Sequence, residues 1–291
     1  MKETMNSPKE IAQNYVTVGA AKTKYTSSKL LLLSILAGMF IAFACVGTTI
    51  ASSTIENAAM AKTISALMFP AGLAMTLIAG SELFTGNTLI IISVLEKQST
   101  IAGMLRNWVI VYIGNFVGAM IIVMLSSYSH TYSMFGNAVA GATIHTAVSK
   151  TSLSFGDALL RGILCNFLVC IAVWMSNAAK DITGRIIALF FPIMLFVESG
   201  FEHSVANMYY IPAGLIARKQ VDYLVSATTV YPGDYLPNLT FGNFIWNNLV
   251  PVTIGNIIGG AALVGITYWF IYIREPENKE QPSRPVKKKK S

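Results

Sequence analysis

The sequence predicts an all-α integral membrane protein with six transmembrane helices per protomer. Hydrophobic residues make up 54% of the 291-residue chain and charged residues only 12%, about half of the roughly 25% that is usual in soluble domains. Mean hydropathy is +0.57. Six apolar segments follow one another along the chain, and about 20 apolar residues suffice to span a bilayer. Two of these segments carry matching polar interruptions, which predict a repeat.

Four of the apolar segments are simple spans, at residues 30–51, 108–125, 158–174 and 249–273. The other two, at 61–95 and 186–217, are too long for one straight crossing, and each contains a polar stretch with glycine. Irregular backbone at membrane depth is tolerated only where it is buried in protein or lines a cavity. We therefore expect helices 2 and 5 to be broken within the membrane.

The two interruptions share the motif G-x-E-x-x-x-x-N, at residues 80–87 and 200–207. Each is followed by I-G-N-x-x-G, at 113–118 and 254–259. Two matched motifs in the same order favour duplication of a three-helix unit over chance, with repeats at about 30–127 and 155–273. Because three is odd, the second copy enters from the opposite face, which gives an inverted repeat. Broken helices at corresponding positions of such repeats indicate a transport site.

The distribution of basic residues predicts that both termini lie in the cytoplasm. Of the 21 lysines and arginines, 16 fall on one side of the expected topology and five on the other: Lys62, Lys150, Arg161, Arg218 and Lys219. This asymmetry is the positive-inside pattern of a multi-pass protein of the cytoplasmic membrane. It accounts for the net charge of +7 without a nucleic-acid partner.

Outside the channel domain at 30–273, the chain ends differ in character. Residues 1–29 are expected to form a cytoplasmic amphipathic helix that begins with a capping box at 7–10. Residues 274–291 predict a disordered basic tail with at most a weak attraction to anionic membrane lipid. Residues 220–248 are expected to form an extracellular loop.

His203 is the only histidine expected at membrane depth, and it lies in the second interruption. An imidazole there can donate a hydrogen bond to an anion or exchange a proton with it near neutral pH. A structural histidine bonded to a backbone carbonyl is the alternative, but intramembrane ionisable residues are functional by default. We expect His203 to bind the solute.

The two glutamates of the interruptions could form a pair of catalytic carboxylates or a cation site. We favour a structural role, since a carboxylate beside the start of a helix accepts hydrogen bonds from free backbone N–H groups. The residues expected to hold the breaks in shape are Gly80, Glu82, Asn87, Gly200, Glu202 and Asn207.

Several other side chains next to the interruptions suit an anion pathway. Apolar constrictions that block hydrated ions are expected from Phe69, Leu73, Phe84 and Phe196, although most phenylalanines of such a protein face lipid. Thr85 supplies a hydroxyl, Asn166 an amide, and Lys150 a charge that concentrates anions at the mouth. Arg161 is expected to pair with Asp157 one turn away.

No ATP-binding loop and no cysteine–histidine cluster with metal-ligand spacing occurs in the sequence, so a pump or metalloenzyme lacks its necessary parts. The three cysteines lie in apolar segments and are expected to be free core residues. The motifs therefore predict no metal, no cofactor and no catalytic residue.

Four stretches resemble the formate/nitrite transporter family: LIAGSELFTG at 77–86, GILCNFLVCIA at 162–172, GFEHSVANM at 200–208 and IGNIIGG at 254–260. The resemblance covers residues 8–273. It implies an aquaporin-like six-helix protomer, a ring of five protomers with one pore each, and conduction of small monovalent anions. By position, Phe69, Leu73, Phe84 and Phe196 would line two constrictions around a chamber. Substrate would meet Thr85 and His203 there, with Asn166 and Lys150 on the outward half.

The predicted function is a channel or transporter for a small monovalent anion, formate before nitrite or hydrosulfide, with proton coupling through His203. A neutral-solute channel of the aquaporin type would need paired Asn-Pro-Ala boxes, and the chain contains no Asn-Pro dipeptide. The alternative of another class is a membrane-embedded enzyme that uses Glu82, Glu202 and His203 as acid and base.

Overall fold

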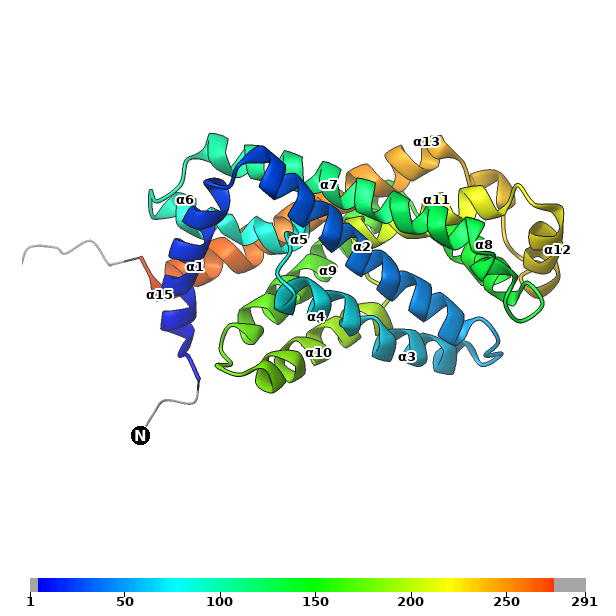
Figure 1. The fold of residues 1–291 in the computed structure, drawn as a ribbon, viewed down its shortest axis with the longest axis horizontal. Helices are drawn as coiled ribbons and strands as arrows, with labels where there is room; N and C mark the ends of the chain where they lie inside the picture. The colour runs from blue at the N-terminus through cyan, green and yellow to red at the C-terminus, as the bar shows by residue number, and fades with distance from the viewer. Residues whose placement is uncertain (1–4, 275–291) are drawn as a thin grey trace, which may run out of the picture.

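The computed structural model describes residues 5–274 and consists of helices and their connections (Figure 1). The described residues form no β-strand, only an isolated antiparallel bridge between Met5 and Ala179. Within this part of the chain, five helical stretches are long and apolar enough to cross a membrane: Ser27–Ser52, Ala58–Ile78, Ile101–Tyr128, Phe155–Ser176 and Phe241–Tyr272. The predicted all-helical fold with apolar helices is confirmed, whereas the count of six crossings stays a prediction.

The first half of the chain runs from a short terminal helix to a long apolar one. Its elements are α1 (Pro8–Thr23), α2 (Ser27–Ser52), α3 (Ala58–Met68), α4 (Pro70–Ile78), α5 (Phe84–Asn87), η1 (Thr88–Ile90), α6 (Ile91–Leu95) and α7 (Ile101–Tyr128). Proline at residue 70 begins α4 directly after α3, so the two helices follow each other closely.

The second half also begins with a short helix and a long helix, α8 and α9, and an interrupted segment follows them as it follows α2. Its elements are η2 (Thr131–Ser133), α8 (Ala138–Thr151), α9 (Phe155–Ser176), α10 (Ile182–Glu198), α11 (Ser204–Ala217), α12 (Val221–Val230), η3 (Leu236–Asn238), α13 (Phe241–Asn243), η4 (Phe244–Leu249), α14 (Val250–Ile257), η5 (Ile258–Ile266) and α15 (Thr267–Tyr272). Two of the turns in the last long stretch, η4 and η5, are π-helical.

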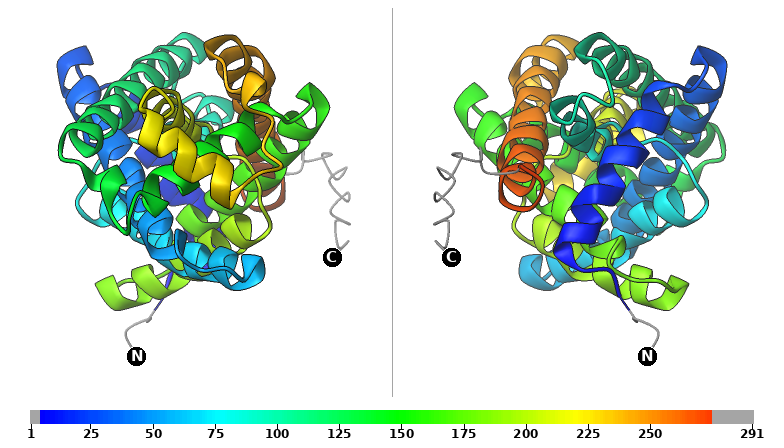
Figure 2. Two further views of the ribbon diagram at one scale, coloured as in Figure 1. Left: turned by 90° about the vertical axis from the view of Figure 1, so that its right-hand side faces the viewer. Right: turned by 90° about the vertical axis from the view of Figure 1, so that its left-hand side faces the viewer.

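Helices α1 and α8 lie at opposite ends of the long axis of the molecule (Figure 1). Viewed from its own end, α1 lies across the molecule beside α15 (Figure 2, right). Helices α2, α7 and α9 run between the two ends, and the interrupted segments lie among them. The interruptions thus lie between the two ends of the molecule, and a short helix, α1 or α8, lies at each end.

Helix α1 has the predicted capping box. The Ser7 hydroxyl accepts the Glu10 N–H, and the Glu10 carboxylate accepts the Ser7 N–H at 2.6 Å. Hydrogen bonds from Ser7 lower the pKa of the Glu10 carboxyl group, and the bond from the backbone N–H has the largest effect. Ile11 and Tyr15 are buried, whereas Val18, about one turn after Tyr15, is 40% exposed. Helix α1 therefore docks mainly through Ile11 and Tyr15.

Three sequence expectations fail or fall outside the described residues. The expected loop at 220–248 contains helix α12, because Tyr223 and Ala227 are buried and α12 packs against α8. Asp157 accepts a hydrogen bond from the Ser154 hydroxyl at the start of α9, and no ion pair with Arg161 forms among residues 5–274. Apart from Arg274, the predicted basic tail lies outside the described residues. Cys45, Cys165 and Cys170 are free and buried, as predicted.

The glycines of the two I-G-N-x-x-G motifs let long helices pack backbone to backbone. A β-carbon at Gly118 on α7 would collide with the Ile35 carbonyl of α2, and one at Gly259 with the Ile163 carbonyl of α9. Small residues at such contacts are a common basis of helix association in membranes, where no hydrophobic force drives one helix onto another. The motifs therefore hold α2 against α7 and α9 against the last long stretch.

The variant Gly118→Val is expected to lower the free energy of unfolding by about 1–3 kcal/mol, because the added carbons force α7 away from α2. Thermal unfolding of the purified protein in detergent measures the loss. Gly47→Ala is the matched control, since a β-carbon there has its nearest neighbour at 3.9 Å, the Met68 methyl group. Equal melting temperatures for both variants would contradict this packing.

Candidate functional site

Both G-x-E motifs lie where helical backbone stops and starts again. Helix α4 ends at Ile78 and α5 begins at Phe84, while α10 ends at Glu198 and α11 begins at Ser204. Gly80 and Gly200 have φ angles of +81° and +69°, in the left-handed region that glycine adopts without steric cost. The motif glycines therefore end the first half-helix of each pair.

Two asparagines of the I-G-N motifs satisfy the backbone at the interruptions. The Phe84 N–H donates to Oδ1 of Asn115 at 2.9 Å, and the Ser204 N–H donates to Oδ1 of Asn256 at 2.9 Å. Each asparagine also donates through Nδ2 to the carbonyl of the motif glutamate, at 3.0 Å in both halves. One amide thus joins the backbone of each gap to the first N–H of the helix that follows it.

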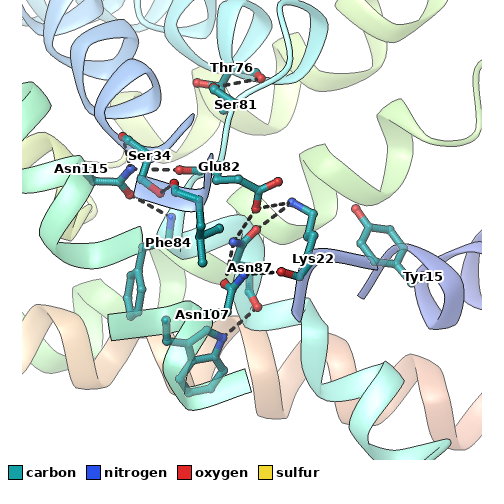
Figure 3. A network of polar contacts seen from close by, with 12 residues as sticks. Tyr15, Lys22, Ser34, Thr76, Ser81, Glu82, Phe84, Asn87, Asn107 and Asn115 are labelled. Carbon is teal, nitrogen blue, oxygen red and sulfur yellow. Dashed lines mark hydrogen bonds and ion pairs between the residues drawn. The ribbon is translucent and has the colours of Figure 1, made fainter. Parts of the chain in front are cut away.

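The first interruption is also held by a cluster of charged and amide side chains (Figure 3). Lys22 Nζ, at the end of α1, lies 2.9 Å from Glu82 Oε2 and 2.8 Å from Asn87 Oδ1. Asn87 Nδ2 donates to Glu82 at 2.7 Å and to Asn107 Oδ1 at 2.9 Å. Asn107 in turn donates to the Lys22 carbonyl at 3.2 Å. The cluster joins α1, α5 and α7.

The second interruption carries an equivalent cluster. Lys150 Nζ, at the end of α8, lies 2.9 and 3.1 Å from the two carboxylate oxygens of Glu202. Asn207 Nδ2 donates to Glu202 and to Asn248 Oδ1, both at 2.7 Å, and Asn248 donates to the Lys150 carbonyl at 3.0 Å. The residues of the two clusters correspond one to one: Lys22 to Lys150, Glu82 to Glu202, Asn87 to Asn207 and Asn107 to Asn248.

The glutamates do not make the backbone hydrogen bonds expected of them. The described contacts of their carboxylates are with lysine and asparagine side chains, and the asparagines Asn115 and Asn256 receive the free N–H groups instead. An amide can donate and accept at once, so it bonds both the N–H and the carbonyl of a gap, whereas an ionised carboxylate only accepts.

Sequence reasoning missed Lys22, Asn107 and Asn248. Their positions carried a signal, because each of the two amides lies eight residues before the I-G-N asparagine, Asn115 or Asn256. Lys22 lies five residues before the first residue of α2, just as Lys150 lies five before α9. A search for the repeat that included α1 would have found them.

Thr85 and His203, both predicted to bind solute, lie in contact. Thr85 Oγ1 is 2.9 Å from Nε2 of His203, and both side chains are buried. His203 also accepts the Ala206 N–H on Nδ1 at 3.2 Å, as the N-cap of α11. A ring nitrogen that accepts carries no proton, so the neutral ring has its proton on Nε2 and donates to Thr85.

Two cavities approach this pair from opposite ends of the molecule. The α8-side cavity, of about 420 Å³, is lined by His203, Lys150, Phe69 and Phe196 among others. The α1-side cavity, of about 140 Å³, is lined by Leu73, Leu83, Tyr15 and Lys22 among others. The Phe69 and Phe196 rings meet edge to face, with centroids 5.3 Å apart.

The remaining predicted site residues lie in three different settings. Phe84 packs its ring against Trp108 and Tyr112 and lines neither cavity. Asn166 is fully buried and donates to the carbonyls of Thr85 and Asn256, at 3.2 and 2.6 Å. It thereby fixes the backbone beside the Thr85–His203 pair. Leu83, which the sequence analysis did not select, directly precedes α5 as His203 precedes α11.

The chain was compared with known proteins. A family model described as formate/nitrite transporter matches residues 9–270. The chain is 38% identical to the formate channel FocA of Escherichia coli strain K12 over 275 residues, 93% of this chain and 96% of that one. It is 40% identical to the formate channel FocA of Haemophilus influenzae over 261 residues, 88% and 90% of the two chains. A solved structure titled pentameric formate channel with formate bound has a TM-score of 0.75 and 34% identity, over 85% of this chain and 98% of that one.

The cluster at the first interruption predicts that a single and a double variant differ in stability. Lys22→Met leaves the buried Glu82 carboxylate without its cation and is expected to lower the free energy of unfolding by about 1–3 kcal/mol. Adding Glu82→Gln removes the unpaired charge and is expected to restore part of that loss. Thermal unfolding in detergent of the two single variants and the double variant measures the coupling. Additive losses would show that the ion pair contributes nothing.

Proposed function

The chain belongs to the formate/nitrite transporter family, and we propose that it is a channel for small monovalent anions, formate foremost. The observation that carries the proposal is the Thr85–His203 contact of 2.9 Å. The α8-side cavity reaches His203, and the α1-side cavity reaches Leu83 and Gly86, which lie close to Thr85 in sequence. A buried Nε2–H donor between apolar walls suits a small anion, because it replaces part of the hydration that the anion loses.

We propose six membrane crossings in this architecture. Helices α3 and α4 with α5 and α6 form one broken crossing, and α10 with α11 forms another. The inverted repeats then include the short helices, with α1 equivalent to α8. The basic residues place the α1 side in the cytoplasm and the α8 side outside. The solved relative described as pentameric supports a homopentamer in the cytoplasmic membrane.

An anion entering from the α8 side first meets the cavity lined by Lys62, Lys150 and Arg161, whose positive charge raises the local anion concentration. It then passes the Phe69–Phe196 pair, where a hydrated ion does not fit. At the centre, the anion replaces the Thr85 hydroxyl as acceptor of the His203 Nε2–H, and the Thr85 hydroxyl donates a second hydrogen bond to the anion. Leu73 and Leu83 form the next apolar passage, and Lys22 lies beyond it in the α1-side cavity.

Proton coupling is the finer part of the proposal. For His203 to protonate an anion, the ring must first become an imidazolium with protons on both nitrogens. The Ala206 N–H occupies Nδ1, so the second proton has to displace that helix cap. The contact therefore favours hydrogen bonding of the anion by a neutral ring over protonation at every transit.

The alternative functions are of two kinds, a channel for another anion and an enzyme. Nitrite and hydrosulfide are the alternatives within the family, since each is a small monovalent anion that a buried donor can hold. The enzyme alternative has lost its support, because relatives that match over most of their length are formate channels and transporters and not enzymes. These relatives support a transport protein.

Flux of formate, nitrite and hydrosulfide into liposomes that hold the purified protein tests the proposal. Formate uptake is expected to exceed that of empty liposomes by more than tenfold and to exceed nitrite uptake at equal concentration. Uptake of none of the three anions would overturn the channel, and faster nitrite or hydrosulfide uptake would reassign its substrate.

The variant His203→Asn keeps a helix-capping oxygen but has no titratable ring. If the neutral histidine only donates a hydrogen bond, the variant is expected to retain slower formate flux, with the pH dependence of the wild type unchanged. Flux measured in the same liposomes between pH 5 and 8 checks this. A pH dependence that disappears in the variant would instead establish protonation by His203.

A further inference from the structure

We propose that the α8-side cavity holds a second anion site, formed by Lys62 and Arg161, that binds a short-chain dicarboxylate. This site lies outside the Thr85–His203 pair. Its occupant is larger than the transported anion and does not pass the phenylalanines. Binding at the site requires no transport, so the inference stands apart from the proposed function.

The two cations approach the second interruption from different helices. Lys62 lies on α3, and its Nζ is 3.9 Å from the position that a β-carbon on Gly200 would take. Arg161 lies on α9, and its carbonyl accepts the Glu202 N–H at 3.3 Å. Both residues line the α8-side cavity. The two residues thus border one space from two walls.

Neither cation is neutralised within the described residues. Lys150, the third cation of the cavity, forms an ion pair with Glu202, whereas no carboxylate of residues 5–274 lies within 4.0 Å of Lys62 or Arg161. The nearby Glu198 accepts a hydrogen bond from Thr63. Glu56, the acid besides Glu202 in the lining, forms no ion pair with either cation. Two unpaired cations in one cavity attract an anion with two charges more than an anion with one.

The size and lining of the cavity favour an organic anion. Its volume of about 420 Å³ falls within the roughly 300–1,000 Å³ of small-molecule sites and far exceeds what a formate ion fills. Carbon-rich side chains of Leu153, Phe201 and Tyr231 belong to the lining. These walls suit a hydrocarbon spacer, and the guanidinium of Arg161 matches a planar carboxylate with two parallel hydrogen bonds. Succinate-like dianions combine these properties, whereas sulfate and phosphate lack the spacer.

An occupant of this site closes the route to His203. The cavity leads to Phe69 and Phe196, and a dianion that bridges Lys62 and Arg161 fills the space before them. We therefore expect a dicarboxylate added on the α8 side to block anion flux competitively, and the same compound on the α1 side to leave it unchanged.

Calorimetric titration of the purified protein with succinate tests the site directly. Wild-type protein is expected to bind one succinate per chain. Lys62→Gln and Arg161→Gln are each expected to weaken binding by about tenfold or more, the usual effect of losing one charge-assisted hydrogen bond. Lys219→Gln is the matched control, because it removes a positive charge after α11, near the same end, from a residue outside the cavity lining.

Other binding results would contradict the site or its proposed ligand class. Absence of succinate binding to the wild type, or equal binding by both glutamine variants and the control, would overturn the site. Sulfate or phosphate that binds as tightly as succinate would overturn the dicarboxylate class. Arg161→Lys keeps the charge and is expected to bind with intermediate affinity, which excludes a folding defect as the cause. Succinate binding in a protein without formate flux would support this site and contradict only the proposed channel.

Discussion

The structure depends on satisfying the backbone where two helices stop inside an apolar protein. In hydrocarbon, each unpaired N–H or C=O group costs several kcal/mol. Asn115 and Asn256 meet part of this demand by bonding the motif glutamate's carbonyl within each gap and the first N–H of the helix that follows it. Without these two amides, neither gap could persist, and the Thr85–His203 contact would have no place between the cavities.

The two halves share the residues that build the gaps and differ in those that face the pathway. Lysine, glutamate and three asparagines recur, whereas Leu83 stands where the second half has His203. The clusters differ as well: Asn87 Oδ1 accepts from Lys22, but the buried Asn207 Oδ1 has no partner among the described residues, and neither does Ser204 Oγ. The unpartnered buried oxygens among the described residues thus lie in the half that contains the histidine.

Composition and motif spacing predicted the helical membrane fold and the capping box, and the family resemblance assigned Thr85 and His203 to one chamber without predicting that they touch. They did not predict that α1 and α8 are equivalent, because both are short and their apolar content is too low to register as spans. The lysine partner of Glu82 was missed for a physical reason. Lys22 is 60 residues away in sequence, and only the folded chain brings an ammonium group to the gap. Arg161 was paired with Asp157 from helical spacing alone, which ignored the competing hydroxyl of Ser154.

The bond between the Ala206 N–H and His203 Nδ1 has a consequence for turnover. It fixes the plane of the imidazole, so that Nε2 alone is free to exchange partners. A passing ion can then replace Thr85 and leave again without any helix changing position. The ring returns to its starting state at the end of each transit, and no slow rearrangement of the protein has to reset it. Such a site supports continuous conduction, in contrast to a carrier whose rate is limited by alternating between two conformations.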